Sequence, residues 1–179
     1  KLEEVAKANP DAWYQQSDLW EVPSDPTAGN AAAKEPAYYL TIRWPNQTEA
    51  AFSLTGVFVP KGRQNLAAYF AVNADASSPD YGKLRVLRMS GSYQIDGPGQ
   101  TFNQITTDPR VAQIMRNYTQ GSSEGKYGNL LTLPVGGGLL YVQPIFAQRT
   151  GTNSSYPVLT YVAARFGQHV GIGTTLQEA

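Results

Sequence analysis

The sequence predicts an α+β protein built mainly on a meander-like antiparallel β-sheet, with an N-terminal helical arm and one central amphipathic helix. Two apolar runs, 130–133 and 139–146, are bounded by proline and glycine and are too short for stable helices, so both indicate strands. Residues 38–44 and 51–59 alternate between two sets of side chains, which is also typical of strands. The clearest helical spacing follows Asp108.

Three consecutive glycines, Gly136, Gly137 and Gly138, separate the two apolar runs. Glycine reaches positive φ angles at little steric cost, so the backbone here can bend sharply or let another group come close. We interpret the three residues as a corner of the sheet. A ligand-binding nest for an anion is the alternative, but the lysine and the Ser or Thr of a phosphate-binding loop are missing.

We expect a helical arm and linker in residues 1–36, followed by one β-rich α+β domain in residues 37–179. The arm would contain a helix end in residues 1–9 and a second short helix that starts at Pro10. It is rich in aromatic residues, which we interpret as anchors to the domain; an aromatic platform for a sugar or peptide is the alternative. Proline, glycine and alanine in residues 23–36 predict a loop.

The first half of the domain predicts four strands joined by short connections, at 38–44, 51–59, 66–74 and 83–89. Alternation places Phe52, Leu54 and Phe58 on one face of the second strand. Ser53 and Thr55 lie on the opposite face.

In the second half, residues 90–104 are expected to be irregular because they contain a Gly-Pro-Gly bend. Asp108 then caps a helix that runs to Gly121. Residues 157–166 predict a strand, with a helix as the alternative, and residues 169–173 close the set. No internal repeat is expected.

Composition excludes several classes of function. The 179 residues include 14 Lys plus Arg and 14 Asp plus Glu, so the net charge is zero and no broad positive field would attract nucleic acid. The absence of cysteine excludes disulfides, thiolate metal sites and cysteine nucleophiles. No motif predicts a cofactor.

One loop has the oxygen spacing of a calcium site, with Asn73, Asp75 and Ser77 at its first, third and fifth positions and Asp80 following. However, the glycine and the glutamate that an EF-hand requires at positions six and twelve are absent. We therefore interpret these residues as turn formers whose side chains bond nearby backbone N–H groups.

Five basic residues are candidates for one cationic side of the sheet: Lys61, Arg63, Lys83, Arg85 and Arg88. Solvated charge is the simplest interpretation. The alternative is a ligand-binding site at Arg63 and Arg85 for anionic lipid headgroups or polymer. His169, the single histidine, lacks an identified orienting partner and a serine in a G-x-S-x-G turn, so no catalytic triad is predicted.

Several segments together resemble uncharacterised protein family 0182, whose members are integral membrane proteins of actinobacteria, cyanobacteria and related bacteria. The resemblance covers nearly the whole chain and rests on these strings: YYLTIRWPNQ, FSLTGVFVPKGRQNLAAYFAVNAD, YGKLRVLRM, DGPGQ, YGNLLTLPVGGGLLYVQPIF, SSYPVL and FGQHVGIGTTLQEA. It implies membrane-spanning segments outside this chain and a location on the extracytoplasmic side of the cell membrane. It implies no activity, cofactor or catalytic residue.

Our first hypothesis is a non-enzymatic binding or assembly module with envelope or membrane proteins as partners. Aromatic and glycine-rich structural strings outnumber any convergent set of titratable residues, which motivates this choice. A cell-envelope hydrolase with paired carboxylates and a regulatory cap of a transporter are the alternatives. A deep cleft lined by two carboxylates, with Asp75, Asp80 or Asp108 among them, would favour the hydrolase.

Overall fold

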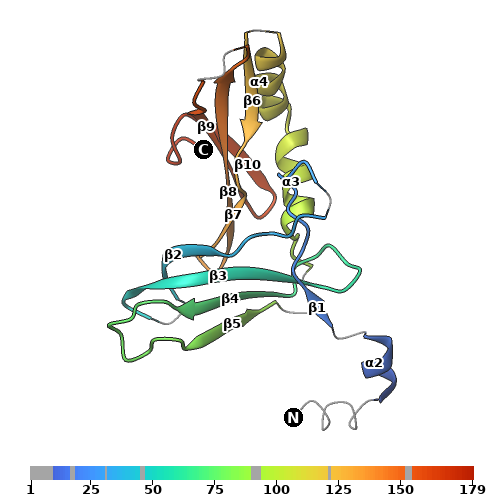
Figure 1. The fold of residues 1–179 in the computed structure, drawn as a ribbon, viewed down its shortest axis with the longest axis vertical. Coiled ribbons are helices and arrows are strands. Elements are labelled where there is room, and N and C mark those ends of the chain that lie inside the picture. Colours follow the sequence, from blue (N-terminus) through green and yellow to red (C-terminus); the bar gives the residue numbers. More distant parts are fainter. Residues whose placement is uncertain are drawn as a thin grey trace.

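The computed structural model consists of two five-stranded antiparallel sheets with helices α3 and α4 beside the second one (Figure 1). We call them sheet 1 (β1 to β5) and sheet 2 (β6 to β10). The structure describes residues 10–16, 19–30, 32–44, 47–89, 94–120, 122–151 and 155–179. The α+β class with dominant antiparallel sheet is therefore confirmed.

Sheet 1 contains β1 (Trp20–Glu21), β2 (Tyr38–Arg43), β3 (Ala50–Pro60), β4 (Ala68–Asn73) and β5 (Leu84–Arg88). The long strand β3 pairs with β4 on one edge, and β1 and β2 share its other edge. The four strands expected in this half are confirmed. Strand β1 was not predicted, because two residues carry no periodicity.

Sheet 2 contains β6 (Ser123–Tyr127), β7 (Leu131–Val135), β8 (Gly138–Arg149), β9 (Val158–Phe166) and β10 (His169–Gly173). Strand β8 pairs with β9 on one edge, and β6 and β7 share its other edge. The helical alternative for β9 is wrong. Strand β6 was not predicted, because its sequence SEGKY has no apolar alternation.

The glycine corner is a tight hairpin turn between β7 and β8. Val135 pairs with Gly138, and the two intervening glycines have φ angles of 60° at Gly136 and 77° at Gly137. Two positive φ angles in a two-residue loop are typical of a type I′ turn, which suits the twist of a hairpin. At Gly138 a Cβ would lie 2.9 Å from the ring of Phe166, so that glycine serves packing.

Helix α4 (Pro109–Thr119) confirms the predicted amphipathic helix, and Asp108 caps it by accepting a hydrogen bond from Arg110 N at 2.9 Å. Helix α3 (Pro98–Thr107) corrects the expectation of an irregular segment at 90–104. The Gly-Pro-Gly sequence starts this helix, because proline suits its first position and the Gln100 side chain accepts a hydrogen bond from Gly97 N. Of the predicted arm, only α2 (Pro10–Gln15) is described as a helix, and residues 1–9 lie outside the described residues.

The two sheets share one topology, although the sequence shows no internal repeat. In each, two short strands precede a long strand and pair with one of its edges, and two further strands continue from its other edge as a meander. A helix directly precedes the first short strand in both units: α2 before β1 and α4 before β6. The fold therefore consists of two β units of equal connectivity.

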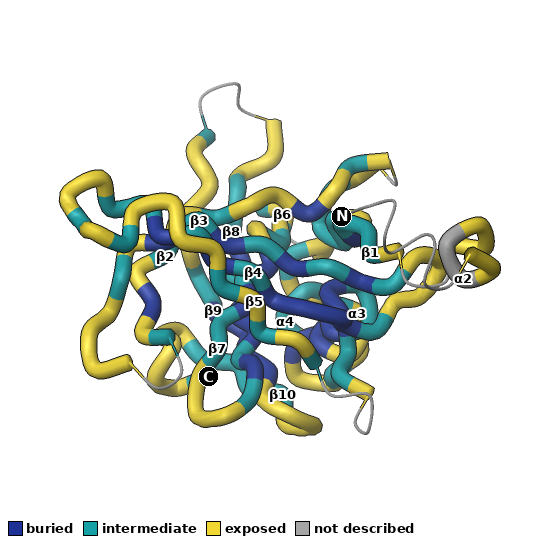
Figure 2. Tube along the Cα trace, turned by 90° about the horizontal axis from the view of Figure 1, so that it is seen from below, coloured by how far each residue is buried: buried dark blue, intermediate teal, exposed yellow. Residues whose placement is uncertain are grey.

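The core lies where sheet 1, sheet 2 and α3 meet, and Figure 2 shows buried segments at the centre with exposed loops around them. Sheet 1 contributes one face to this core, through Ile42, Val57, Tyr69 and Ala71. The α3 and α4 helices and sheet 2 contribute Ile105, Val111, Leu130, Leu139, Tyr141, Ile145 and Ala163. The other face of sheet 1 points away from sheet 2.

Candidate functional site

A groove of about 650 Å³ separates sheet 1 from the β7–β8 hairpin of sheet 2. Its volume lies within the range of ligand pockets, roughly 300–1,000 Å³. The lining is mostly apolar and comprises Thr41, Ile42, Arg43, Trp44, Gln47, Leu87, Met89, Ile95, Leu133, Pro134, Val135, Gly136, Gly137, Gly138 and Leu139.

Strand β2 forms one wall of the groove and has a free edge. Within the described residues β2 pairs only with β3. Phe52 O accepts a hydrogen bond from Ala74 N at 2.8 Å, on the β4 side, so the main chain of Phe52 points away from β2. Thr41 lies opposite Phe52, and its N–H and C=O therefore point outward from the sheet. Arg43, two residues on, has the same orientation.

The β7–β8 hairpin forms the opposite wall. Strand β7 includes Pro134, which lacks an N–H and suits an edge strand. The turn residues Gly136 and Gly137 have no side chains and open space where a Cβ would be, so no side chain restricts access to the groove at this turn. One wall thus offers unpaired main-chain groups, and the other offers an apolar surface.

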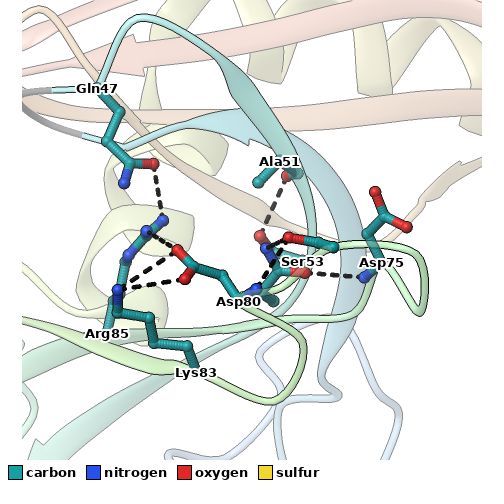
Figure 3. Close-up of polar contacts among 9 residues, drawn as sticks. Gln47, Ala51, Ser53, Asp75, Asp80, Lys83 and Arg85 are labelled. Carbon is teal, nitrogen blue, oxygen red and sulfur yellow. Dashed lines mark hydrogen bonds and ion pairs between the residues drawn. The ribbon is translucent and has the colours of Figure 1, made fainter.

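A polar pocket of about 480 Å³ shares Gln47 with the groove. Gln47 Oε1 accepts a hydrogen bond from Arg85 Nη1 at 2.8 Å, and Arg85 Nη2 lies 3.3 Å from Asp80 Oδ2 (Figure 3). Lys83 Nζ lies 3.3 Å from the same oxygen. The carboxylate of Asp80 therefore pairs with two cations, and Arg85 also bonds Gln47, a residue of the groove lining.

The residues proposed for ligand binding separate into two places. Gly136, Gly137 and Gly138 line the groove, and Arg85 reaches it through Gln47. Arg63 lies in the turn after β3, where its N–H bonds to Pro60 O, and it lines neither cavity. The tertiary structure thus places the three glycines in the groove and Arg85 in the neighbouring polar pocket, and a role in binding stays a prediction.

The Asn73–Asp80 loop has the geometry of a turn. Asp75 Oδ1 accepts hydrogen bonds from Ser77 N at 2.9 Å and Ser77 Oγ at 2.7 Å, and these bonds lower the pKa of the Asp75 carboxyl group. Asn73 Oδ1 similarly accepts one from Asp75 N. Across the described ranges no three His, Cys, Asp or Glu residues are close enough to hold a metal ion.

The carboxylates named for a hydrolase do not form an acid and base pair. Asp75 and Asp80 line the polar pocket, but one bonds its own turn and the other pairs with Lys83 and Arg85. Asp108 caps α4, and the Arg110 side chain lowers its pKa. A general acid in glycoside hydrolysis needs a raised pKa, whereas the pKa values of the Asp75 and Asp108 carboxyl groups are lowered. His169 is an exposed residue at the start of β10.

Glu35 is a buried carboxyl group that the sequence reading missed. It is 8% exposed, and its Oε2 atom has no hydrogen-bond partner among the described residues. Burial, and secondarily the charge of Asp25, raises its pKa to about 8. Tyr38, Thr55 and Tyr69 surround it in a small cavity next to β7. Its place in a Pro- and Ala-rich loop gave no signal of burial.

These features define a class of protein: a two-unit α+β domain with a groove at an open strand edge. The model of an uncharacterised protein family (UPF0182) matches residues 2–118. A UPF0182 protein of Thermobifida fusca (strain YX) is 47% identical over 178 residues, covering 99% of this chain and 18% of the relative. One from Paenarthrobacter aurescens (strain TC1) is 43% identical over 182 residues, covering 96% and 18%. The chain belongs to the UPF0182 family.

The chain spans about a fifth of the length of these relatives. No solved structure matches it. No helix in the part of the chain that the structure describes is long and apolar enough to cross a membrane.

Proposed function

We propose that this chain is a non-enzymatic binding and assembly module that takes an extended polypeptide segment as an added strand along β2. The free edge of β2 beside the apolar groove carries this proposal. An extended segment would satisfy the outward N–H and C=O groups of Thr41 and Arg43. Its alternate side chains would enter the groove against Trp44 and Leu133, which would supply specificity.

We place the module on the extracytoplasmic side of the bacterial cell membrane, with an envelope or membrane protein as the source of the segment. The family resemblance supports this location. Attachment to the membrane would use segments outside this chain, and the share of the relatives that it spans, 18%, leaves room for them.

A proline scan of the free edge tests the proposal. Ten-residue random peptides displayed on phage are selected against the chain, and the affinity of the best peptide is measured by fluorescence anisotropy. Thr41→Pro removes one outward N–H and leaves the bonds to β3 intact, so binding should weaken at least about tenfold. Thr41→Val keeps the N–H and is the matched control.

Equal binding to the wild type and to Thr41→Pro would contradict strand addition. Hydrogen exchange provides a second readout, because a bound strand should protect the amides of Thr41 and Arg43. Val135→Trp should also weaken binding, because it fills the groove. If every selected peptide binds this variant as tightly as the wild type, the peptides bind outside the groove and the proposal is wrong. Val135 is exposed at the groove, and Val158→Trp is a control at an exposed strand residue elsewhere.

A further inference from the structure

Sheet 1 presents its more hydrophobic face to solvent. On the core side of β3, Ser53 is 4% exposed and Thr55 is 3% exposed. On the other side Phe52 is 44% exposed, and Tyr39 of β2 stacks on it at 5.4 Å between ring centroids while being 62% exposed. An uncovered face with large aromatic side chains on adjacent strands is unusual for a protein surface and indicates an interaction site.

The apolar surface extends across all five strands. Leu84 and Val86 continue it on β5, and both are exposed. Trp20 of β1 meets Phe70 of β4 edge to face at 6.2 Å between ring centroids. The described helices leave it open, since α3 and α4 pack beside sheet 2 and α2 extends beyond β1 (Figure 2). We call this surface the outer face of sheet 1.

The equivalent face of sheet 2 is covered by helices. We identify the equivalent faces by the direction of main-chain carbonyl groups in the long strands β3 and β8. Phe52 O points toward β4, where it accepts a hydrogen bond from Ala74 N. Ile145 O points toward β9, where it accepts a hydrogen bond from Thr160 Oγ1 at 3.1 Å. Because the two units have the same strand order, such residues lie on the same face in each. Tyr127, opposite Ile145, packs against Phe102 of α3 at 5.2 Å between ring centroids.

Each face also has a flat position formed by glycine. In sheet 2 the Cβ of a residue in place of Gly125 would lie 2.7 Å from the ring of Tyr118 and 3.0 Å from Met115, so glycine lets α4 lie close to the strand. In sheet 1 Gly56 lies on the outer face between Leu54 and Phe58, and nothing lies within 4 Å of its Cβ position. A helix could therefore lie equally close to β3 at Gly56.

The charged strand residues on the outer face are basic. Arg43 ends β2 and Arg88 ends β5, where its guanidinium lies 5.9 Å from the Trp20 ring centroid. The strand residues of sheet 1 include a single carboxylate, Glu21, which pairs with buried Val59 and faces inward. An acidic partner would therefore be complementary to this face.

We propose that the outer face of sheet 1 docks an amphipathic helical segment of a protein partner, with acidic residues beside its apolar stripe. The helix lies across β3 above Gly56, as α4 lies on β6 above Gly125. The relatives have about four-fifths of their length outside this match, which gives a helical segment of the same longer protein as one source. This surface shares Arg43 with the groove at β2, but Gly56 does not line that groove, so Gly56→Glu tests the outer face by itself.

The probe is an 18-residue helical peptide with a leucine stripe flanked by glutamates, compared with the same stripe flanked by lysines. Binding to the whole chain is measured by fluorescence anisotropy. The glutamate peptide should bind at least about tenfold more tightly than the lysine peptide. The double change Arg43→Gln and Arg88→Gln should remove this preference.

Gly56→Glu should abolish binding, because docking would bury an unpaired carboxylate. Gly99→Glu, at another glycine with open space around its Cβ position, is the matched control and should bind normally. Equal binding of both peptides, or unchanged binding to Gly56→Glu, would overturn the proposal. Dimerisation of the chain that Gly56→Glu abolishes, without peptide binding, would identify a second copy as the occupant and would also overturn it.

Discussion

Sheet 1 and sheet 2 have the same connectivity but differ in what covers them. In sheet 2, α3 and α4 lie on one face, and the buried Arg165 donates a hydrogen bond to Thr101 of α3 there. In sheet 1 the matching face is open, and the polar Ser53 and Thr55 lie on the core side instead. In sheet 1 the neighbouring elements therefore decide which side is buried, because the side with the larger aromatic residues faces solvent.

The largest expected difference concerns two arginine–aspartate pairs, one in each sheet. Arg165 is 3% exposed and lies 2.6 Å from Asp96, whereas the pair of Arg85 with Asp80 lies nearer the surface at 3.3 Å. Removing one partner of a buried pair leaves an unpaired charge, so Arg165→Ala should cost about 3–5 kcal/mol of unfolding free energy. Arg85→Ala should cost about 1 kcal/mol or less.

Urea unfolding followed by circular dichroism measures both values. Similar losses for the two variants would contradict the difference in burial. Arg165→Lys is a useful control, because it retains the charge but loses the second hydrogen bond that Arg165 makes to Thr101 at 3.2 Å.

The second prediction concerns the loop that separates β1 from β2, where sheet 2 has only three residues between β6 and β7. Glu35 in that loop has a pKa raised to about 8 by burial. Its neutral form is favoured in the folded state, so its contribution to stability is complete below the unfolded pKa of 4.5 and is lost as the pH rises through 8.

Glu35→Gln stays neutral, so it should match the wild type near pH 4.5 and exceed it by about 2–4 kcal/mol at pH 9. Chemical unfolding at a series of pH values measures the difference, in which the other titrating groups cancel. A variant that follows the wild-type profile throughout would show that the carboxyl group is not buried in solution.

The third prediction compares Gly125, which α4 covers, with Gly56, which no helix among the described residues covers. Gly125→Val would press against Tyr118 and Met115, so it should destabilise the protein by about 1–3 kcal/mol and loosen α4. Gly56→Val has open space around it and should change stability by about 0.5 kcal/mol or less. Thermal unfolding of both variants, with hydrogen exchange in α4, tests whether the helix cover makes the difference.

The smallest loss of stability is expected at Asp108, the N-cap of α4. Asp108→Ala removes the side-chain acceptor for Arg110 N and should cost about 1 kcal/mol. The Asp108 carboxyl has a lowered pKa, so its contribution is present at neutral pH and is lost as the pH falls through that value. Asp108→Asn keeps an acceptor oxygen and should retain most of the stability at pH 7.

Local patterns predicted much of the secondary structure. Alternation placed Phe52 and Leu54 on one face and Ser53 and Thr55 on the other, and both assignments to strand faces are correct. The glycine run predicted a corner of the sheet, and the structure has a hairpin turn there. Helix α3 was missed, because a Gly-Pro-Gly sequence favours a bend and a helix start equally until the capping contact from Gln100 is known.

The candidate site was less accessible to sequence reading. Its walls come from β2, β5 and the β7–β8 hairpin, so Trp44, Leu87 and Leu133 meet only after the two sheets pack. The outward N–H of Thr41 depends on which residues of β3 bond to β4. Local periodicity predicts neither the groove nor the direction of this N–H group.

Local sequence was enough for most of the strands, for the α4 helix, for a bend at the glycines and for the two sets of side chains on the predicted strands, because these features depend on residues close together in the chain. Only the tertiary structure decided that Phe52 faces solvent, that Glu35 is buried and that β2 ends the sheet beside a groove. Those outcomes depend on where α3, α4 and sheet 2 pack, and long-range packing has no signature in a single local segment.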